Sequence, residues 1–366
     1  MSDAYAAAGV DTGRADAGVA AIVAMLKTIE TGRERLTVPL PGHYASVLRL
    51  PAAVAPNAGI ALATDSVGSK VIVAEQAGRF DTIGIDCVAM NVNDLICVGA
   101  QPLALLDYLA VEQADPELLS AIAHGLALGA TEAGVEIPGG EVCQVPELLR
   151  GHPSPYGFDL VGSAFGVVAL DQLIDGSTVA PGDALIGLPA SGVHSNGLTL
   201  ARRALLEQGR LALSDTPAVL GGQSVADVLL EPTVIYVRAI LALLASEVQV
   251  HGLAHITGGG LLNLRRIGVG VGYAVSDPLP SPPVFGLIAE LGEVGTAEMW
   301  EVFNMGCGFV AMVAAEQAAA AVRLLAEFHP GSAVIGEVTG RAGVLELPGL
   351  RVRAGAGAGG ERLRDY

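Results

Sequence analysis

Apolar residues in the first part of the chain form short runs that stop abruptly at a carboxylate. Residues 60–63 are all apolar and end at Thr64-Asp65, and Gly68 then opens a turn. Four apolar residues bounded by turn-forming residues predict a short buried strand. Asp65 and Lys70 should therefore lie at the rim of a sheet, where binding sites are usually built.

A helical repeat follows between residues 85 and 96, where apolar side chains recur every three or four positions. Asp86 and Asn93 are seven residues apart, so they share one face of this helix, and Asp94 adds a carboxylate to its apolar interior. An unpaired carboxylate is costly to bury, which favours a functional role for Asp94. Asp86 has a plainer alternative as a helix N-cap, which is worth roughly 1 kcal/mol.

Two long apolar strands and one well-marked helix come next. Residues 103–111 and 158–170 are the strands. Asp115 followed by proline opens the helix, and Gly134 closes it, which is the usual order of capping residues.

A further carboxylate, Glu141, follows Gly139-Gly140, and we expect it to be presented just after a tight glycine turn. Carboxylates from separate elements can converge on hard cations, which take oxygen ligands and bridge them to nucleotide phosphates. The candidates for such a site are Asp65, Asp86, Asp94 and Glu141.

The second half of the chain twice repeats a strand, a glycine-bearing loop and a helix. The first copy covers residues 184–208 and the second covers residues 250–267. A helix that starts after such a loop offers backbone N–H groups to a phosphate. The loop residues proposed to bind substrate or phosphate are Ser191, Gly192, Ser195, Asn196, Thr257, Gly258 and Gly259. His194 lies inside the first loop, and it adds a group that can exchange a proton near neutral pH.

These elements predict an α+β fold with two domains, each a mixed sheet covered by helices. The turn-rich stretch 171–183 separates residues 1–170 from residues 171–353. We also expect a helix over residues 16–31 and an apolar helix that starts at Glu231-Pro232. Residues 354–366 alternate glycine and alanine before a charged end and should form a disordered tail.

Composition narrows the class of protein. Hydrophobic residues make up 51% of the 366 positions and charged residues only 16%, which favours a well-buried α/β protein. The formal charge of −18 disfavours nucleic acids and anionic membranes as partners, but it leaves phosphorylated small molecules open. The four cysteines form no C-x-x-C pair, and no signal peptide or membrane span is apparent, so we expect a soluble cytoplasmic protein with reduced thiols.

Five motifs in series resemble those of the aminoimidazole ribonucleotide synthetase (phosphoribosylformylglycinamidine cyclo-ligase) family. They span nearly the whole chain in the order of that family: Thr64-Asp65-x-x-Gly68-x-Lys70, Gly84-Ile85-Asp86 through Val92-Asn93-Asp94, Gly139-Gly140-Glu141, Ser191-Gly192-x-His194-Ser195-Asn196-Gly197 and His255-Ile256-Thr257-Gly258-Gly259-Gly260.

The resemblance implies ATP-dependent ring closure of formylglycinamidine ribonucleotide in purine biosynthesis, with Mg²⁺ as the metal. It also implies a homodimer formed through the first domain. It assigns nucleotide binding to Asp65, Gly68, Lys70, Asp86, Asn93, Asp94 and Gly140, metal binding to Asp65, Asp94 and Glu141, and catalysis to His194, Lys70 and Asp94.

Two departures from the family pattern leave alternatives open. Only Gly42 remains where the family usually has a glycine-rich loop over the nucleotide, and Gln144 stands where the family usually has a second carboxylate. The alternatives are another ATP-dependent enzyme of the same superfamily, such as thiamine-phosphate kinase or selenophosphate synthetase, or a nucleotide-binding protein that has lost catalysis. His194 and His255 could each be structural.

Overall fold

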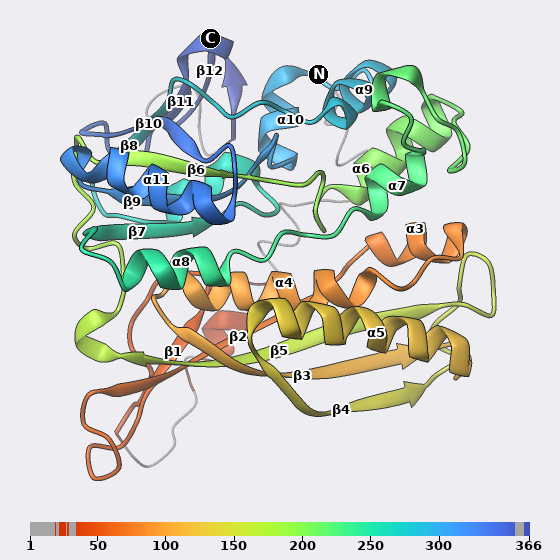
Figure 1. Cartoon of the computed structure of the whole chain (residues 1–366), viewed down its shortest axis with the longest axis horizontal. Coiled ribbons are helices and arrows are strands. Elements are labelled where there is room, and N and C mark those ends of the chain that lie inside the picture. The colour runs from red at the N-terminus through yellow and green to blue at the C-terminus, as the bar shows by residue number, and fades with distance from the viewer. Residues whose placement is uncertain (1–18, 20–21, 27, 29–33, 356–361) are drawn as a thin grey trace.

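The computed structural model describes residues 19, 22–26, 28, 34–355 and 362–366. Most of the helix expected over residues 16–31 lies outside this part of the chain. The described residues form two sheets with helices packed between and around them (Figure 1).

The first sheet has five strands in the order β1-β2-β5-β3-β4. They are β1 (Ser46–Arg49), β2 (Ala58–Ser66), β3 (Gln101–Val111), β4 (Glu136–Gln144) and β5 (Phe158–Ala169). The helices α4 (Ile83–Ile96) and α5 (Pro116–Ala133) cover one face, and within residues 34–355 no helix covers the opposite face (Figure 1). The predicted mixed sheet is confirmed, since β4 is parallel to β3 and β5 is antiparallel to it.

Local sequence explains the pair of helices on this sheet. Asp115 caps α5 by accepting hydrogen bonds from the N–H groups of Glu117 and Leu118, and Gly134 ends the helix with φ of 71°. A β-carbon at Gly84 would lie 2.1 Å from the backbone nitrogen of Leu126. The glycine therefore lets α4 and α5 approach closely over the sheet.

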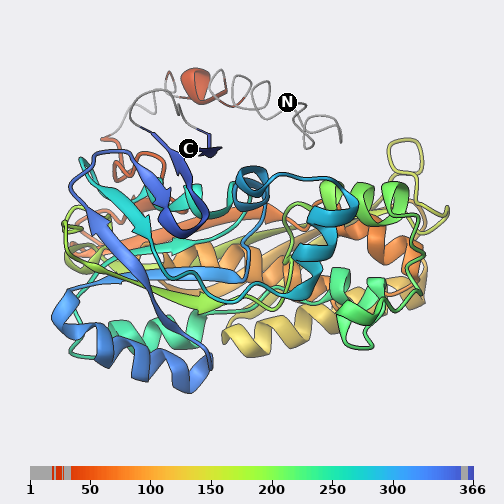
Figure 2. The same cartoon turned by 90° about the horizontal axis from the view of Figure 1, so that it is seen from above.

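The second sheet has eight strands in the order β13-β12-β11-β8-β10-β6-β9-β7. They are β6 (Ala184–Pro189), β7 (Val250–His255), β8 (Gly272–Val275), β9 (Cys307–Val313), β10 (Ala333–Thr339), β11 (Leu345–Leu347), β12 (Val352–Ala354) and β13 (Arg364–Asp365). Helix α11 (Ala318–Phe328) packs on β6 and β10, and α8 (Val237–Leu244) lies beside α11 (Figure 2). The remaining helices are α3 (Lys70–Ala77), α6 (Leu198–Arg202) with a π-helical continuation (Arg203–Gln208), α7 (Val225–Leu230), α9 (Pro283–Leu291), α10 (Thr296–Val302) and the 3₁₀ helix η4 (Gly260–Arg266).

Helix α4 joins the two halves, because it contacts β2 and β5 on one side and α8 and β7 on the other. Twelve of its fourteen residues are buried. Asp86, Asn91 and Asn93 are therefore enclosed polar residues of α4, while the Asp94 side chain remains 20% exposed.

Three expectations from the sequence differ from the structure. The apolar helix begins at Val237 rather than at Glu231, and residues 231–236 form an irregular segment in front of it. Glu141 lies inside strand β4 instead of after a tight turn, because Gly139 and Gly140 continue that strand. Residues 362–366 are ordered on the second sheet, since Arg364 pairs with Arg353 and Arg362 forms an ion pair with Glu301.

Candidate active site

A buried ion pair lies where the two halves meet. Lys70 is at the first position of α3 and Asp86 is in the first turn of α4, and neither side chain is exposed. Lys70 Nζ lies 2.9 Å from Asp86 Oδ1 and also donates to the carbonyl oxygen of Glu231 at 2.6 Å. Burial lowers the pKa of Lys70, while the adjacent Asp86 carboxylate opposes this shift.

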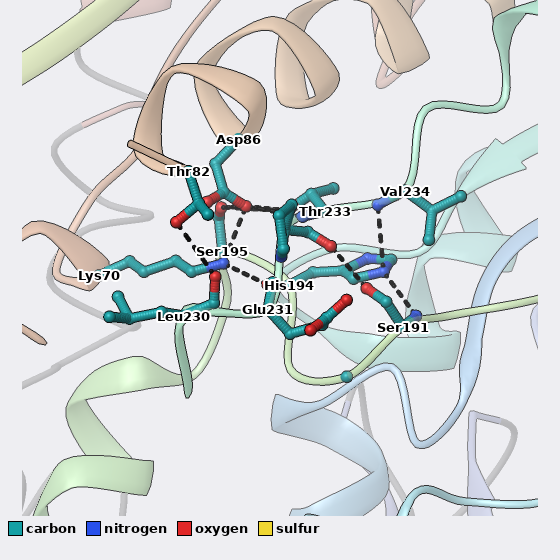
Figure 3. A network of polar contacts seen from close by, with 12 residues as sticks. Lys70, Thr82, Asp86, Ser191, His194, Ser195, Leu230, Glu231, Thr233 and Val234 are labelled. Atoms are coloured by element: carbon teal, nitrogen blue, oxygen red, sulfur yellow. Dashed lines mark hydrogen bonds and ion pairs between the residues drawn. The ribbon is translucent and has the colours of Figure 1, made fainter. Parts of the chain in front are cut away.

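Asp86 accepts three further hydrogen bonds from the second half of the chain. They come from the backbone N–H of Thr233 at 2.8 Å, its hydroxyl at 2.7 Å and the hydroxyl of Ser195 at 3.1 Å (Figure 3). Oδ1 of Asp86 is therefore an acceptor for groups of both halves, while Oδ2 is buried without a hydrogen-bond partner, and the nucleotide role implied by the resemblance stays a prediction. The alternative interpretation of Asp86 as a helix N-cap is wrong, because Thr82 occupies the N-cap position of α4.

Asn93, seven residues after Asp86 on the same face of α4, also binds groups of the second half. Its Nδ2 donates to the carbonyl of Val234 at 2.8 Å, and its Oδ1 accepts from the N–H of Tyr236 at 3.0 Å. Asp86 and Asn93 do share one face of the helix, as the spacing predicts, and both bind the segment 231–236. Buried side chains thus satisfy backbone groups that a helix or strand would otherwise satisfy.

His194 is enclosed in the same network, with 1% of its surface exposed. Its Nε2 accepts from the N–H groups of Ser191 at 3.3 Å and Val234 at 3.5 Å, so the ring proton is on Nδ1. Burial lowers the pKa of His194 well below its usual value, with His255 and Lys70 adding to the shift. The ring is neutral and fixes the loop backbone, and its predicted role in proton transfer stays a prediction.

A second polar cluster lies toward the other end of α4. His255 Nδ1 donates to Asp94 Oδ1 at 2.8 Å, and its Nε2 is 3.5 Å from Asn93 Nδ2. Burial raises the pKa of Asp65, and the nearby carboxylate of Asp94 raises it further. Asp65 and Asp94 therefore lie close enough to repel each other, which favours binding of a cation beside them.

The two predicted glycine loops lie side by side. A β-carbon at Gly258 would be 3.3 Å from Oδ1 of Asn196. Asn304 donates to the carbonyl of Gly192 at 2.8 Å, and Asn263 donates to the carbonyls of Gly258 and Gly260 at 3.2 and 2.7 Å. Asparagine side chains therefore shape both loops.

The remaining predicted residues fall at separate places. Gly68 connects β2 to α3 with φ of 69°, and Gly259 precedes η4 with φ of 100°. Gly140 lies in β4, where a β-carbon would contact the side chain of Asp107. Ser191 donates its hydroxyl to the carbonyl of Pro232 at 2.6 Å.

Glu141 is not brought to Asp65 and Asp94. It pairs in register with Tyr108, which pairs with Val161, which pairs with Ser66, so these four side chains share one face of the sheet. Asp65 precedes Ser66 in β2 and so points to the opposite face, three strands away. In the described part of the chain, no three His, Cys, Asp or Glu side chains are grouped in a way that could hold a metal ion.

Models of two protein domains match this chain. Residues 42–168 match the N-terminal domain of AIR synthase related proteins, and residues 180–346 match the C-terminal domain. The phosphoribosylformylglycinamidine cyclo-ligase of Methanothermobacter thermautotrophicus is 45% identical over 94% of this chain and 96% of its own length. That of Thermococcus kodakarensis is 46% identical over 95% and 97%. The chain belongs to the phosphoribosylformylglycinamidine cyclo-ligase family.

The fold extends beyond the cyclo-ligase family. A crystal structure of the hydrogenase maturation protein HypE in complex with ATP superposes with a TM-score of 0.57, covering 78% of this chain and 80% of that one at 24% identity. At this identity the likeness concerns the fold alone.

Sequence patterns missed several residues of this candidate site. Thr233 is 2% exposed and gives Asp86 two hydrogen bonds, but it stood inside the helix expected from Glu231. Pro232 was the available signal, since the residue before a proline disfavours helical geometry. Asn304 donates to the carbonyl of Gly192, 112 residues away, and no local pattern marks such a contact. Asn263 donates to carbonyls only five and three residues away, but nothing in the glycine loop itself singles it out.

A pocket of about 240 Å³ opens beside the first glycine loop. Ser191, Gly192, Gln223 and Glu231 supply its polar lining, and α9 closes it with Pro283 and Val284. Lys70 and Ser191 hold the two neighbouring carbonyls of Glu231 and Pro232. The buried network thus shapes the wall of an open pocket.

Proposed function

We propose that this protein catalyses the ATP-dependent closure of formylglycinamidine ribonucleotide to aminoimidazole ribonucleotide, with release of ADP and phosphate. The identity of about 45% to cyclo-ligases over 94% of the chain carries this proposal. The site supports it, because two glycine loops from the second half adjoin carboxylates from the first half.

The chemistry explains the need for ATP. A formyl amide oxygen is a poor leaving group, and transfer of the γ-phosphoryl group converts it into a phosphate ester. The amidine nitrogen then attacks the same carbon, a C–N bond forms, and phosphate leaves with the former formyl oxygen. Catalysis of phosphoryl transfer depends on positioning and on stabilising charge.

Asp65 and Asp94 fit a Mg²⁺ site, since they are carboxylates close enough to repel each other. Bound there with nucleotide phosphates, the ion would neutralise charge on the transferred group. Asp94 is oriented by His255, which donates to one of its oxygens. Glu141 faces the uncovered side of the sheet, so a metal role for it needs a second subunit to complete the site.

The two domains are proposed to have different roles. Residues 1–170 would bind ATP and metal and form the dimer, and residues 171–353 would bind the ribonucleotide. Ser191, Gly192, Ser195 and Asn196 of one loop and Thr257, Gly258 and Gly259 of the other are the proposed phosphate and substrate contacts. The altered segment around Gly42 belongs to the same interface, because Tyr44 donates to the carbonyl of Asn263 at 3.2 Å.

The assay that tests the proposal measures ADP release and formation of the aminoimidazole product. We expect both to require ATP and formylglycinamidine ribonucleotide together. ADP release with thiamine phosphate but not with the ribonucleotide would support a kinase of the same superfamily. Nucleotide binding without turnover of either substrate would support a protein that has lost catalysis.

A further inference from the structure

Glu231 contributes a carboxylate to the pocket of about 240 Å³ beside the first glycine loop. Among the described residues that line this pocket, Glu231 alone carries a charge. Lys70 binds its backbone carbonyl, whereas no described residue forms a hydrogen bond or an ion pair with its carboxylate, and no dashed line ends there in Figure 3. The fold therefore leaves this carboxylate available to a ligand.

The backbone that carries the carboxylate is held from two sides. Lys70 Nζ donates to the carbonyl of Glu231 at 2.6 Å, and the Ser191 hydroxyl donates to the carbonyl of Pro232 at 2.6 Å. A β-carbon at Gly192 would lie 3.8 Å from the β-carbon of Glu231, so the glycine loop packs against the side chain. Glu231 is consequently only partly exposed and fixed relative to the loop.

The polar lining favours a cationic ligand over an anionic one. Both donors of Ser191 are used, because its N–H donates to Nε2 of His194 at 3.3 Å and its hydroxyl to Pro232. Its hydroxyl oxygen, the Gln223 carbonyl and the Glu231 carboxylate remain as acceptors. The carboxylate repels an anion, whereas a positively charged hydrogen-bond donor would be stabilised beside it.

The size of the pocket indicates that it takes one end of the substrate. Pockets that hold a whole small molecule usually measure roughly 300–1,000 Å³, so this smaller one fits part of a nucleotide. The phosphate of the ribonucleotide is left to the other end of the loop, where Asn196 adjoins Gly258.

The substrate of the proposed reaction has one group that matches the acceptors. Its amidine is basic and planar, and it presents N–H donors side by side. A carboxylate binds such a group through two parallel charge-assisted hydrogen bonds, as it binds the guanidinium of arginine.

We propose that Glu231 binds the amidine of formylglycinamidine ribonucleotide and selects it over the corresponding amide. The amide carries an oxygen in place of a protonated nitrogen, so it would face the carboxylate with a second acceptor. This inference rests on the proposed function, because it names a specificity residue for the same substrate. Glu231 belongs to none of the five motifs that resemble the cyclo-ligase family, so the assignment comes from the pocket.

Binding of two ribonucleotides to the full-length protein tests the proposal. One is formylglycinamidine ribonucleotide, and the other is its analogue with an amide in place of the amidine. A non-hydrolysable ATP analogue and Mg²⁺ are present, so that no turnover occurs. The variants are Glu231→Gln, which removes the charge at constant size, and Glu231→Asp, which keeps the charge. Glu207→Gln, at an exposed position, removes the same charge elsewhere and is the matched control.

We expect the wild-type protein to bind the amidine about 10²-fold or more tightly than the amide, because the amide leaves the carboxylate unpaired. Glu231→Gln should weaken amidine binding at least about tenfold, the scale of a lost hydrogen bond to a charged group. Its binding of the amide should hold or improve, since the glutamine N–H group can donate to the amide oxygen. Glu231→Asp should keep a preference for the amidine, and Glu207→Gln should match the wild type.

An amidine-to-amide preference that is unchanged in Glu231→Gln would overturn the proposal. Equal weakening of both ligands would also overturn it, because that result shows a structural role in shaping the pocket. Turnover by the wild-type protein together with either result removes this contact alone. Failure of the wild-type protein to bind the amidine would overturn the proposed function, and this inference with it.

Discussion

At the scale of single residues, one oxygen of Asp86 accepts four hydrogen bonds, and these come from both halves of the molecule. This oxygen, Oδ1, cannot also bind a cation without breaking the contacts that hold the halves together, whereas Oδ2 of Asp86 is buried without a hydrogen-bond partner. Asp65 accepts a hydrogen bond from the N–H of Ser66, and Asp94 accepts one from His255. Among the described residues of the second half, His255 alone donates to this pair of carboxylates. We therefore expect the metal at Asp65 and Asp94.

Asp65→Asn should abolish turnover while the melting temperature changes little. The substitution keeps the shape of the side chain but removes the charge that would hold Mg²⁺. Product formation measured across a range of Mg²⁺ concentrations tests this, with Asp81→Asn in an exposed turn as the control. Near-normal activity of Asp65→Asn at limiting Mg²⁺ would remove it from the metal site.

His194→Ala separates a catalytic role from a structural one. Because Nε2 accepts two backbone N–H groups, we expect the alanine variant to be less stable and to have a raised KM with a largely preserved kcat. Steady-state kinetics with a thermal melt provide the measurement. A fall in kcat of about 10²-fold or more would show proton transfer by His194, since general acid–base groups contribute on that scale.

At the scale of elements, buried polar side chains of α3 and α4 hold the segment 231–236. Lys70 binds the carbonyl of Glu231, and Asn93 binds Val234 and Tyr236. Since no strand or helix satisfies this backbone, its conformation depends on those side chains. The pocket beside Glu231 depends on them in turn.

Lys70→Met should destabilise the protein by about 3 kcal/mol or more, because removing one partner leaves Asp86 as an uncompensated buried charge. Chemical denaturation measures the change. The control is Arg79→Met, whose ion pair with Asp227 is 43% and 42% exposed and should be worth less than about 1 kcal/mol.

A Lys70→Met variant that stays as stable as the wild type would contradict the structural role. If it also lost affinity for ATP, the nucleotide role predicted from the sequence would be favoured. In the structure Lys70 is fully enclosed, so direct contact with ATP requires the ion pair to open.

Sequence patterns predicted the elements whose signals are local. The caps Asp115 and Gly134 defined α5, and apolar periodicity defined α4 together with the shared face of Asp86 and Asn93. The partners of that face could not be predicted, because Thr233 and Tyr236 lie more than 140 residues further along the chain. Glu141 was misplaced for a related reason, since a glycine pair can lie in a strand as well as in a turn.

At the scale of the whole molecule, none of the helices in the described residues is long and apolar enough to cross a bilayer. The face of the first sheet that no described helix covers carries exposed apolar side chains. Leu106, Tyr108 and Val167 point from β3 and β5 to this face and are 40%, 43% and 40% exposed. Apolar side chains gathered on an open sheet face are typical of a protein interface.

We propose that this face joins two copies of the chain. A symmetric dimer buries the same patch on both subunits, so a charge placed on the patch meets its own copy across the axis. Leu106→Asp should therefore shift the protein from dimer to monomer, which sedimentation at micromolar concentration measures. Leu128→Asp is the control, because that residue is 47% exposed on α5, over the opposite side of the sheet.

A wild-type protein that sediments as a monomer would rule out the dimer, and a Leu106→Asp variant that stays dimeric would move the contact to another face. Glu141 lies on the same face, so dissociation should also reduce turnover if that carboxylate serves a site completed by the second subunit.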